Sequence, residues 1–361
     1  MNRILAALAL TTAASFLNLP ASDACTRVVY KGPEATVLTA RSMDWSEDVQ
    51  TNLWIFPRGM QRNGEVGNLS LKWTSSYGSI VATGYDISTT DGMNEKGLVA
   101  NVLWLAESQY PVWDLKKPGL SIAAWAQYVL DNFASVSEAV TELEKESFTI
   151  VTSNVPGQSR LTTLHLSISD ATGDNAILQY IDGKLVIHHD TSYVVMTNSP
   201  IYEKQLALNE YWREIGGTTM LPGTNRAADR FVRASFYIKA IPQTSDSRLA
   251  VASVFSVIRN CSVPYGISTP GQPNISSTRW RVLADHKNKV YYYESALTPN
   301  TFWVDLKKID FSSKGSVKKL NMTRNETYAG EVSGSFVNTP PFKFEGISEA
   351  QLQEMIKSGG R

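Results

Sequence analysis

Cys25 is the residue of this sequence that is best placed for chemistry. It is one of two cysteines in the chain, the other being Cys261. It follows Ser22-Asp23-Ala24, and small residues three positions and one position before a cleavage point are typical of exported proteins. Cleavage after Ala24 would make Cys25 the first residue of the mature chain. Its thiol could then act as a nucleophile and its own α-amine as the base, without a histidine.

The first 24 residues predict a signal peptide. Asn2 and Arg3 form a short polar and basic start, and residues 4–17 are mostly apolar. This run is shorter than the roughly 20 residues that a membrane-spanning helix needs, and no later stretch is apolar enough to span. The sequence therefore predicts a leader over 1–24, a single domain over 25–361, and a periplasmic or secreted protein without stable membrane insertion.

Two other roles for Cys25 stay open. A bacterial lipoprotein also begins at a cysteine, but its processing site requires an aliphatic residue three positions earlier, where this chain has Ser22. A disulfide between Cys25 and Cys261 is the second alternative, because two cysteines in an exported protein commonly pair. That bridge would remove the thiolate and leave a secreted, non-catalytic binding protein.

The histidines do not complete a cysteine–histidine pair or a metal site. The chain has four, at His165, His188, His189 and His286. The first two fall in alternating runs typical of strands, where a histidine is more often structural, and no local pattern marks a partner for Cys25. No cluster of histidine and cysteine has the spacing of metal ligands. We therefore expect no metal and no cofactor.

Charge and composition restrict the kind of partner. The chain carries 34 basic and 34 acidic residues, and 43% of its 361 residues are hydrophobic. No net field therefore favours nucleic acid or an anionic membrane surface. A small molecule is the expected partner, and no nucleic acid is expected.

Many short strands and a few helices must position these residues. Alternating apolar runs at 26–30 and 35–45, joined by Lys31-Gly32-Pro33, predict a hairpin that holds Cys25 in a sheet. Further strand-like runs cover 52–57, 69–74, 98–105, 161–169, 176–181, 184–189, 192–197, 279–286 and 289–295. Helical patterns cover 120–133, 135–146, 227–240 and 248–260, the second with Ser135 and Glu138 as a capping box. Strands interrupted by helices predict one α+β domain in which helices cover sheets.

Five segments, taken together and in order, resemble the choloylglycine hydrolase family of N-terminal nucleophile hydrolases. They read CTRVVYKGPEATVLTARSMDW (25–45), TTDGMNEKGLVANVLWL (89–105), VVMTNSP (194–200), LPGTNRAADRFVRA (221–234) and NCSVPYG (260–266). The family includes penicillin V acylases and bile salt hydrolases. The resemblance implies a four-layer αββα sandwich and hydrolysis of a small N-acyl amide at its linear C–N bond.

The resemblance also implies roles for five residues, namely Cys25, Arg41, Asp44, Asn198 and Arg230. Cys25 corresponds to the nucleophile, and we expect Arg41 and Arg230 to favour its thiolate. Asp44 would hold the α-amine, and the amide of Asn198 would donate to the oxyanion. Without the resemblance, Arg41 and Asp44 would be interpreted as a structural ion pair, and Asn198 as a residue that favours a turn.

Three tryptophans, Trp45, Trp104 and Trp113, are expected to bind the acyl group of the substrate. Apolar aromatic walls suit a phenoxyacetyl group or a fatty acyl chain, although tryptophans also commonly fill a core. Trp104 stands where relatives often carry a tyrosine or asparagine as the second oxyanion donor. Indole cannot replace a carboxamide there, so a backbone amide is the alternative donor.

The spacing of about 30 residues between Asn198 and Arg230 resembles the Gram-negative branch of the family. That branch implies penicillin V acylase activity, together with deacylation of N-acyl-homoserine lactones and hence quorum quenching. Bile salt hydrolysis is the alternative within the same chemistry. The resemblance leaves a homo-oligomer, dimer or tetramer, open.

Overall fold

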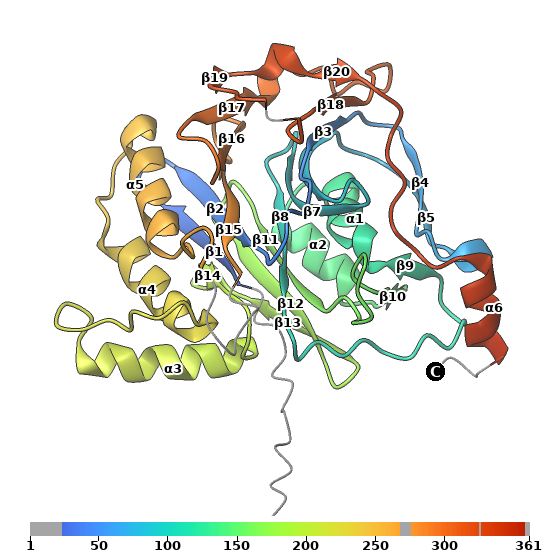
Figure 1. Ribbon diagram of the computed structural model, residues 1–361, viewed down its shortest axis with the longest axis horizontal. Coiled ribbons are helices and arrows are strands. Elements are labelled where there is room, and N and C mark those ends of the chain that lie inside the picture. The colour runs from blue at the N-terminus through green and yellow to red at the C-terminus, as the bar shows by residue number, and fades with distance from the viewer. Residues whose placement is uncertain (1–23, 268–275, 325, 358–361) are drawn as a thin grey trace, which may run out of the picture.

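Two large sheets form the centre of the molecule (Figure 1). The computed structural model describes residues 24–267, 276–324 and 326–357. The seven-stranded sheet has the order β14 (Val195–Met196), β1 (Cys25–Lys31), β2 (Val37–Asp44), β15 (Thr278–Asp285), β16 (Val290–Ser295), β17 (Thr301–Asp305) and β19 (Gly330–Glu331). Its pairings are antiparallel except that of β17 with β19.

The second sheet has nine strands and is antiparallel throughout. Its order is β13 (Lys184–His189), β12 (Asn175–Ile181), β11 (Leu164–Ser169), β8 (Val99–Trp104), β7 (Ser88–Asn94), β6 (Ser79–Gly84), β3 (Leu53–Phe56), β18 (Lys318–Leu320) and β20 (Val337–Asn338). β1 of the first sheet contacts β8 of the second. The inner faces of the two sheets therefore pack against each other.

Helices cover both outer faces. α1 (Trp125–Asn132) packs on β7 and β8 and α2 (Val136–Leu143) on β12, while α4 (Ala227–Ala240) packs on β1 and α5 (Ser247–Asn260) on β2 and β15. α3 (Tyr202–Ile215) lies against α4. In Figure 1 these two helix layers stand on opposite sides of the stacked sheets. The predicted αββα sandwich of the α+β class is confirmed.

Short elements complete the chain. β4 (Gln61–Asn63) pairs with β5 (Lys72–Thr74), and β9 (Gly119–Ser121) pairs in parallel with β10 (Thr149–Val151). The 3₁₀ helices are η1 (Gly67–Leu69), η2 (Ile122–Ala124), η3 (Leu306–Lys308) and η4 (Ser333–Ser335), and α6 (Glu349–Lys357) packs on η1. No helix within 24–267, 276–324 and 326–357 combines the length and apolarity needed to cross a membrane.

The hairpin of β1 and β2 forms where the sequence predicts it. Gly32 donates its backbone N–H to the carbonyl of Thr36 at 2.8 Å, which closes the turn. Cys25 then lies opposite Met43, so that the start of β1 meets the end of β2. All eight residues of β2 are buried, because helices cover one face of its sheet and the other sheet covers the second.

The sequence predictions and the structure differ at two helices and at several strands, including β6, β7 and β17, which lie outside the predicted runs. The pattern at 120–133 predicts one helix, but β9 and η2 occupy its beginning and α1 starts at Trp125. α3 was not predicted, because its polar residues hide the apolar periodicity on which a prediction depends. Ser135 caps α2 as predicted, accepting from the N–H of Glu138 at 3.2 Å. The predicted leader lies outside the described residues except for Ala24.

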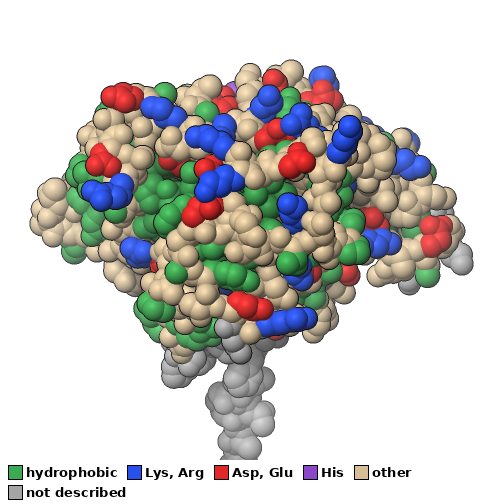
Figure 2. All heavy atoms as spheres, turned by 90° about the horizontal axis from the view of Figure 1, so that it is seen from above, with side chains coloured by type: hydrophobic (Ala, Val, Ile, Leu, Met, Phe, Trp, Pro, Cys, Tyr) green, Lys and Arg blue, Asp and Glu red, His purple; other side chains and the backbone are tan. Residues whose placement is uncertain are grey.

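Acidic and basic side chains are interspersed on the face shown in Figure 2. Neither sign of charge forms an extended patch over that face, in agreement with the equal numbers of acidic and basic residues in the sequence.

Candidate active site

The five predicted catalytic residues come together at one end of the seven-stranded sheet. Cys25 begins β1, and Arg41 and Asp44 lie on β2 beside it. Asn198 follows β14, which pairs with the other side of β1, and Arg230 projects from α4, which packs on β1. Residues that are up to 205 positions apart in sequence therefore surround Cys25.

Cys25 is held at its backbone nitrogen and surrounded at its sulfur. The nitrogen donates to Oδ1 of Asn198 at 2.5 Å. The sulfur lies 3.7 Å from Nη2 of Arg41 and 3.9 Å from the carbonyl oxygen of Asp44. Only 1% of the residue is exposed. A nitrogen and a sulfur that belong to the same residue are thus fixed next to each other.

Arg41 is a buried guanidinium with partners on several sides. Its Nη2 donates to the carbonyl of Val102 at 3.1 Å and its Nη1 to that of Thr90 at 3.2 Å. Asp91 lies 3.7 Å from Nη1, and the ring of Trp280 lies 4.8 Å from the guanidinium carbon. These contacts fix the positive charge beside the thiol before any substrate arrives.

Asp44 is fully buried and bound by hydroxyl groups. It accepts from Oγ1 of Thr278 at 2.5 Å and from Oγ of Ser42 at 3.4 Å, and Nη1 of Arg230 lies 4.0 Å away. Burial raises the pKa of Asp44 to about 6, against the opposing effects of Arg230 and the two hydroxyls. The carboxyl is therefore ionised at neutral pH and gains a proton in mildly acidic solution.

Arg230 joins the ends of the site. Its Nη1 donates to the carbonyl of Cys25 at 2.5 Å and to Oγ1 of Thr26 at 2.6 Å, and its Nη2 donates to Oδ1 of Asn198 at 2.9 Å. Its Nε donates to the carbonyl of Asn225 at 2.9 Å. Burial lowers the pKa of this guanidinium, and Asp44 opposes that effect. Four hydrogen bonds hold the group in one orientation.

Asn198 has both ends of its side chain engaged. Its Oδ1 accepts from Cys25 and Arg230, and its Nδ2 donates to the carbonyl of Trp104 at 2.8 Å. Gln205 of α3 donates to the backbone carbonyl of Asn198. A carboxamide nitrogen has two hydrogens, so the bond to Trp104 orients the amide and leaves one hydrogen for an oxyanion.

Burial raises the pKa of the Cys25 thiol, and this effect exceeds the opposing effect of Arg41. The carboxylate of Asp44 adds to the rise, whereas its backbone favours the thiolate. Arg41 thus acts in the predicted direction, but in this buried state the thiol is the favoured form. Formation of the thiolate requires a neighbouring group that takes up the proton.

An apolar pocket lies beside the nucleophile. Met43, whose sulfur is 4.0 Å from that of Cys25, is part of its wall. The rings of Trp45 and Trp104 also line it, with centroids 5.7 Å apart at 59°. The pocket has an empty volume of about 640 Å³, including the part that is open to solvent. Its other walls are mostly apolar and include Val49, Ile87, Ile122, Ala123, Val155, Pro156 and Leu164.

Trp113 does not belong to this pocket. It is buried in a separate cluster with Val66, Val151 and Leu352, and its Nε1 donates to the carbonyl of Lys117 at 2.9 Å. The expectation that Trp113 contacts the acyl group therefore does not fit its position. It fills core, which was the alternative for each tryptophan.

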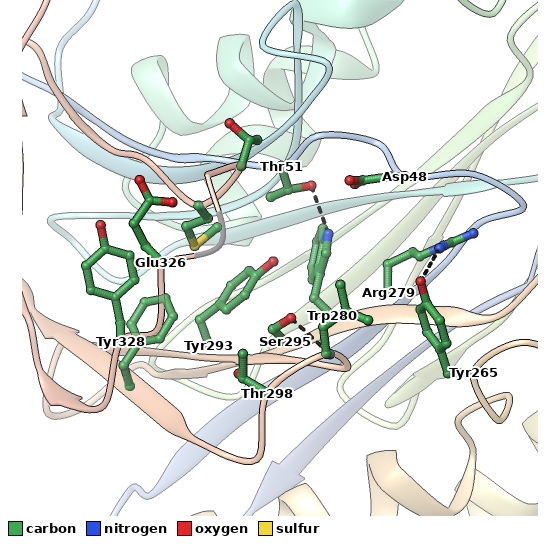
Figure 3. Close-up of a pocket in the computed structure, with 14 residues that line it drawn as sticks. Asp48, Thr51, Tyr265, Arg279, Trp280, Tyr293, Ser295, Thr298, Glu326 and Tyr328 are labelled. Atoms are coloured by element: carbon green, nitrogen blue, oxygen red, sulfur yellow. Dashed lines mark hydrogen bonds between the residues drawn. The ribbon is translucent and has the colours of Figure 1, made fainter.

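A second pocket, shown in Figure 3, has Trp280 in its lining. The indole of Trp280 that stacks on Arg41 forms part of its lining, and its Nε1 donates to Thr51 at 2.9 Å. Arg279 donates to the backbone carbonyls of Trp45 at 2.9 Å and Ser46 at 2.6 Å. Trp280 and Arg279 therefore support Arg41 and the segment after Asp44.

The two cysteines do not pair with each other, and the histidines occupy strands or buried positions. Cys25 and Cys261, both of which are described, are buried free thiols and do not form a disulfide. His165 and His286 are fully buried in hydrogen-bonded positions, and His188 and His189 lie on β13. Within the described ranges, no three His, Cys, Asp or Glu side chains form a group that could hold a metal.

Thr278 and Gln205 are contacts of the site that the sequence did not predict. Thr278 binds Asp44 across 234 positions, and Gln205 binds the backbone of Asn198 from a helix that was itself missed. A strand threonine and a helical glutamine carry no local pattern that points to a site. Only the fold brings them to it.

Comparison with known proteins places this chain in a family. The model of linear amide C-N hydrolases of the choloylglycine hydrolase family matches residues 25–319. A penicillin V acylase from Pectobacterium atrosepticum is 56% identical over 363 residues, covering 94% of this chain and 96% of that protein. A bile salt hydrolase/transferase from Clostridium perfringens is 24% identical, covering 79% of this chain and 93% of that protein.

Solved structures agree with these matches. The penicillin V acylase from Agrobacterium tumefaciens has a TM-score of 0.84 and 64% identity, covering 90% of this chain and 100% of that chain. A variant of the conjugated bile acid hydrolase from Clostridium perfringens has a TM-score of 0.72 and 22% identity, covering 84% and 99% of the two chains. The second likeness is one of fold.

Proposed function

Because the chain belongs to the choloylglycine hydrolase family of linear amide C-N hydrolases, we propose that it is a penicillin V acylase whose N-terminal nucleophile is Cys25. The main support is the placement of the nitrogen and sulfur of Cys25 between Asn198, Arg41 and Asp44, next to an apolar pocket. The family match begins at Cys25, in agreement with removal of the residues before it. An exported, periplasmic or secreted protein is part of the proposal.

Before the reaction, cleavage after Ala24 releases the α-amine of Cys25. The amine takes the thiol proton, and the thiolate, next to Arg41, attacks the amide carbonyl. The carbonyl oxygen becomes an oxyanion that accepts from Nδ2 of Asn198; losing such a donor costs roughly 3 to 4 kcal/mol of barrier. The ammonium then protonates the leaving nitrogen, and water hydrolyses the thioester to release the acid and the free Cys25.

The walls of the pocket support an aromatic or apolar acyl group. Trp45 and Trp104 form two sides at 59° to each other, into which the flat phenoxyacetyl group of penicillin V fits. A fatty acyl chain has the same apolar requirement, so deacylation of N-acyl-homoserine lactones, and through it quorum quenching, is a second proposed activity. Hydrolysis of conjugated bile salts, which the names of more distant relatives suggest, is the alternative.

The spacing of a cysteine and an arginine in a relative adds to the support for the roles of Cys25 and Arg41. Two solved variants of the conjugated bile acid hydrolase replace a cysteine and an arginine that lie as many positions apart as Cys25 and Arg41. The same two residue types thus occur at the same separation in a protein of this fold.

The deciding experiment compares the mature protein with its Cys25→Ala variant. Each would be incubated with penicillin V, with glycine- and taurine-conjugated bile acids, and with a long-chain N-acyl-homoserine lactone, while mass spectrometry identifies the N-terminal residue. We expect a chain that begins at Cys25, cleavage of penicillin V in preference to bile salts, and loss of about four orders of magnitude or more in kcat in the variant.

Circular dichroism of the variant serves as the control for folding. Equal cleavage by both proteins would reject Cys25 as the nucleophile. No cleavage by reduced, fully processed protein would reject the enzyme activity and favour the binding-protein alternative. Preferred cleavage of bile salts would keep the mechanism and change the substrate.

A further inference from the structure

Arg160 covers the two indoles that line the apolar pocket. Its guanidinium carbon lies 4.4 Å from the ring centroid of Trp104 and 5.3 Å from that of Trp45. The residue is half-buried, so that a positive charge lies at the boundary between the apolar walls and solvent. Stacking on aromatic faces is favourable for arginine, and it fixes the plane of the guanidinium.

A tight turn presents Arg160 to the pocket. Val155 donates its N–H to the carbonyl of Arg160 at 2.9 Å, and Gln158 donates to the carbonyl of Val155 at 2.9 Å. Gly157 within the turn has a φ of +73°, which glycine adopts without strain. Residues 153–156, which lead into the turn and begin it, line the pocket. The position of Arg160 is therefore coupled to the pocket wall.

A chain of side-chain hydrogen bonds holds the same group from the other side. Nε of Arg160 donates to Gln158 at 2.7 Å, and Gln158 donates to Glu47 at 3.3 Å. Tyr85 donates to Glu47 at 2.8 Å and accepts from Nε1 of Trp45 at 3.1 Å. The chain returns to an indole that Arg160 covers, so these five residues form a closed ring, of which Trp45 and Tyr85 also line the pocket.

We propose that Arg160 determines specificity by binding an anionic group on the amine half of the substrate, an inference that rests on the proposed function. With the acyl half in the apolar pocket and the scissile bond at Cys25, the amine half must lie toward solvent. Trp104 connects the two places, because its carbonyl binds Asn198 of the site and its ring lies under Arg160. Arginine pairs with carboxylates in two-pronged geometry, and an apolar surround strengthens the pair.

The consequence is a preference among amides that share an acyl group. Substrates whose amine half carries a carboxylate, as the penicillin nucleus and amino-acid conjugates do, gain a contact that a neutral homoserine lactone lacks. Penicillin V and its methyl ester form a matched pair, because they differ in this charge and in little else. Glu47 is the nearby carboxylate of the ring, and its bonds from Tyr85 and Gln158 engage it away from the substrate.

The test measures kcat and KM of the mature protein for penicillin V and for its methyl ester. We expect Arg160→Gln to raise KM for the acid about fivefold, as for a partly exposed ion pair, with kcat and the values for the ester unchanged. Arg160→Lys should keep part of the preference, because the charge remains but the planar fork is lost. Arg213→Gln, on the exposed face of α3, is the control for a change of net charge.

Binding to an inactive Cys25→Ser protein separates this inference from the proposed function. If the mature protein hydrolyses neither compound but the Cys25→Ser protein binds the acid about fivefold more tightly than the ester, the penicillin V proposal fails and the anion site stands. Equal affinity for acid and ester in that protein would overturn the role of Arg160. So would an Arg160→Gln variant that loses acid and ester alike, because Arg160 would then only support the indoles.

Discussion

The buried carboxyl of Asp44 gives the proposed mechanism a pH dependence. Burial disfavours the carboxylate and raises its pKa to about 6, so that about half of these groups are protonated at pH 6 and most of them at pH 5. In the structure the nitrogen of Cys25 donates to Asn198. If the ionised carboxyl of Asp44 supports the α-amine of Cys25 after cleavage, we expect kcat/KM to fall about fivefold between pH 6 and pH 5. The pH–rate profile of the mature protein with penicillin V measures this.

Asp44→Asn is the matched variant, since the amide keeps the shape and does not ionise. We expect a lower kcat/KM at neutral pH and no limb near pH 6. A variant that keeps the same limb would assign it to another group, such as the α-amine, whose ordinary pKa is about 8.

The sequence predicted the members of the site better than their environment. Cys25, Arg41 and Asp44 lie on one predicted hairpin, and the structure brings Asn198 and Arg230 to it; their catalytic roles stay predictions. Burial was not predictable, and it decides that the thiol is the favoured form of Cys25. Trp113 was expected to bind the acyl group but lies in a core cluster, because aromatic character alone does not distinguish a pocket wall from core.

The 3₁₀ helix η2 forms part of the pocket wall through Ile122 and Ala123. The larger side chain of Ala123→Leu should occupy pocket space that the small side chain of Ala123 leaves open. We expect kcat/KM for a dodecanoyl amide to fall about tenfold relative to a hexanoyl amide with the same amine, since overpacking costs about 1 to 3 kcal/mol. Kinetics on the two amides would measure the ratio.

The unfolding temperature of this variant is the control, because a general loss of packing would lower activity on both amides. An unchanged ratio would show that acyl chains do not reach Ala123 and would require a different location for them.

The same segment explains a limit of the prediction. Residues 120–133 have a helical pattern, and a pattern of burial does not say where a helix begins. Ser121 accepts from the N–H of Ala123 at 3.2 Å and donates to the carbonyl of Glu345, a residue far along the chain. Contacts between distant segments thus shape the beginning of this element. For α4, whose residues Phe231 and Ile238 meet the core, the predicted bounds agree with the structure.

The molecule as a whole should lose stability in acid through its buried histidines. His286 is fully buried, with its ring nitrogens 2.6 Å from the carbonyl of Gly97 and 2.7 Å from Oγ1 of Thr39. Burial lowers its pKa to about 4, whereas the unfolded chain takes up the proton near pH 6.5. The stability that the buried, neutral ring of His286 gives the folded protein is therefore fully present above pH 6.5 and is lost as the pH falls toward 4.

Urea unfolding at pH 7 and pH 5 tests this difference. The wild type should lose about 2 kcal/mol more of its unfolding free energy than His286→Gln does over this interval. Groups with opposite shifts, such as Asp44, are common to both proteins and cancel in the comparison. Equal losses in the two proteins would contradict the assignment.

The sandwich of sheets and helices could be predicted in class but not in arrangement. Alternating runs separated by turns predict strands, and the family resemblance adds the four layers. The pairing of β2 with β15, which joins positions 41 and 282, depends on the collapse of distant segments. It also brings Thr278 to Asp44, so the unpredicted part of the fold and the unpredicted part of the site have the same cause.

Arg41 and Arg230 differ from Arg160 in depth, and this difference gives the proposed catalytic and recognition roles different responses to dissolved salt. Arg41 and Arg230 are 1% and 0% exposed, whereas Arg160 is half-buried above the indoles of Trp45 and Trp104. Mobile ions screen exposed charges and reach buried pairs much less. Under the proposed roles, the ionic strength of the surroundings would therefore act more strongly on the selection of an anionic substrate than on bond cleavage at Cys25.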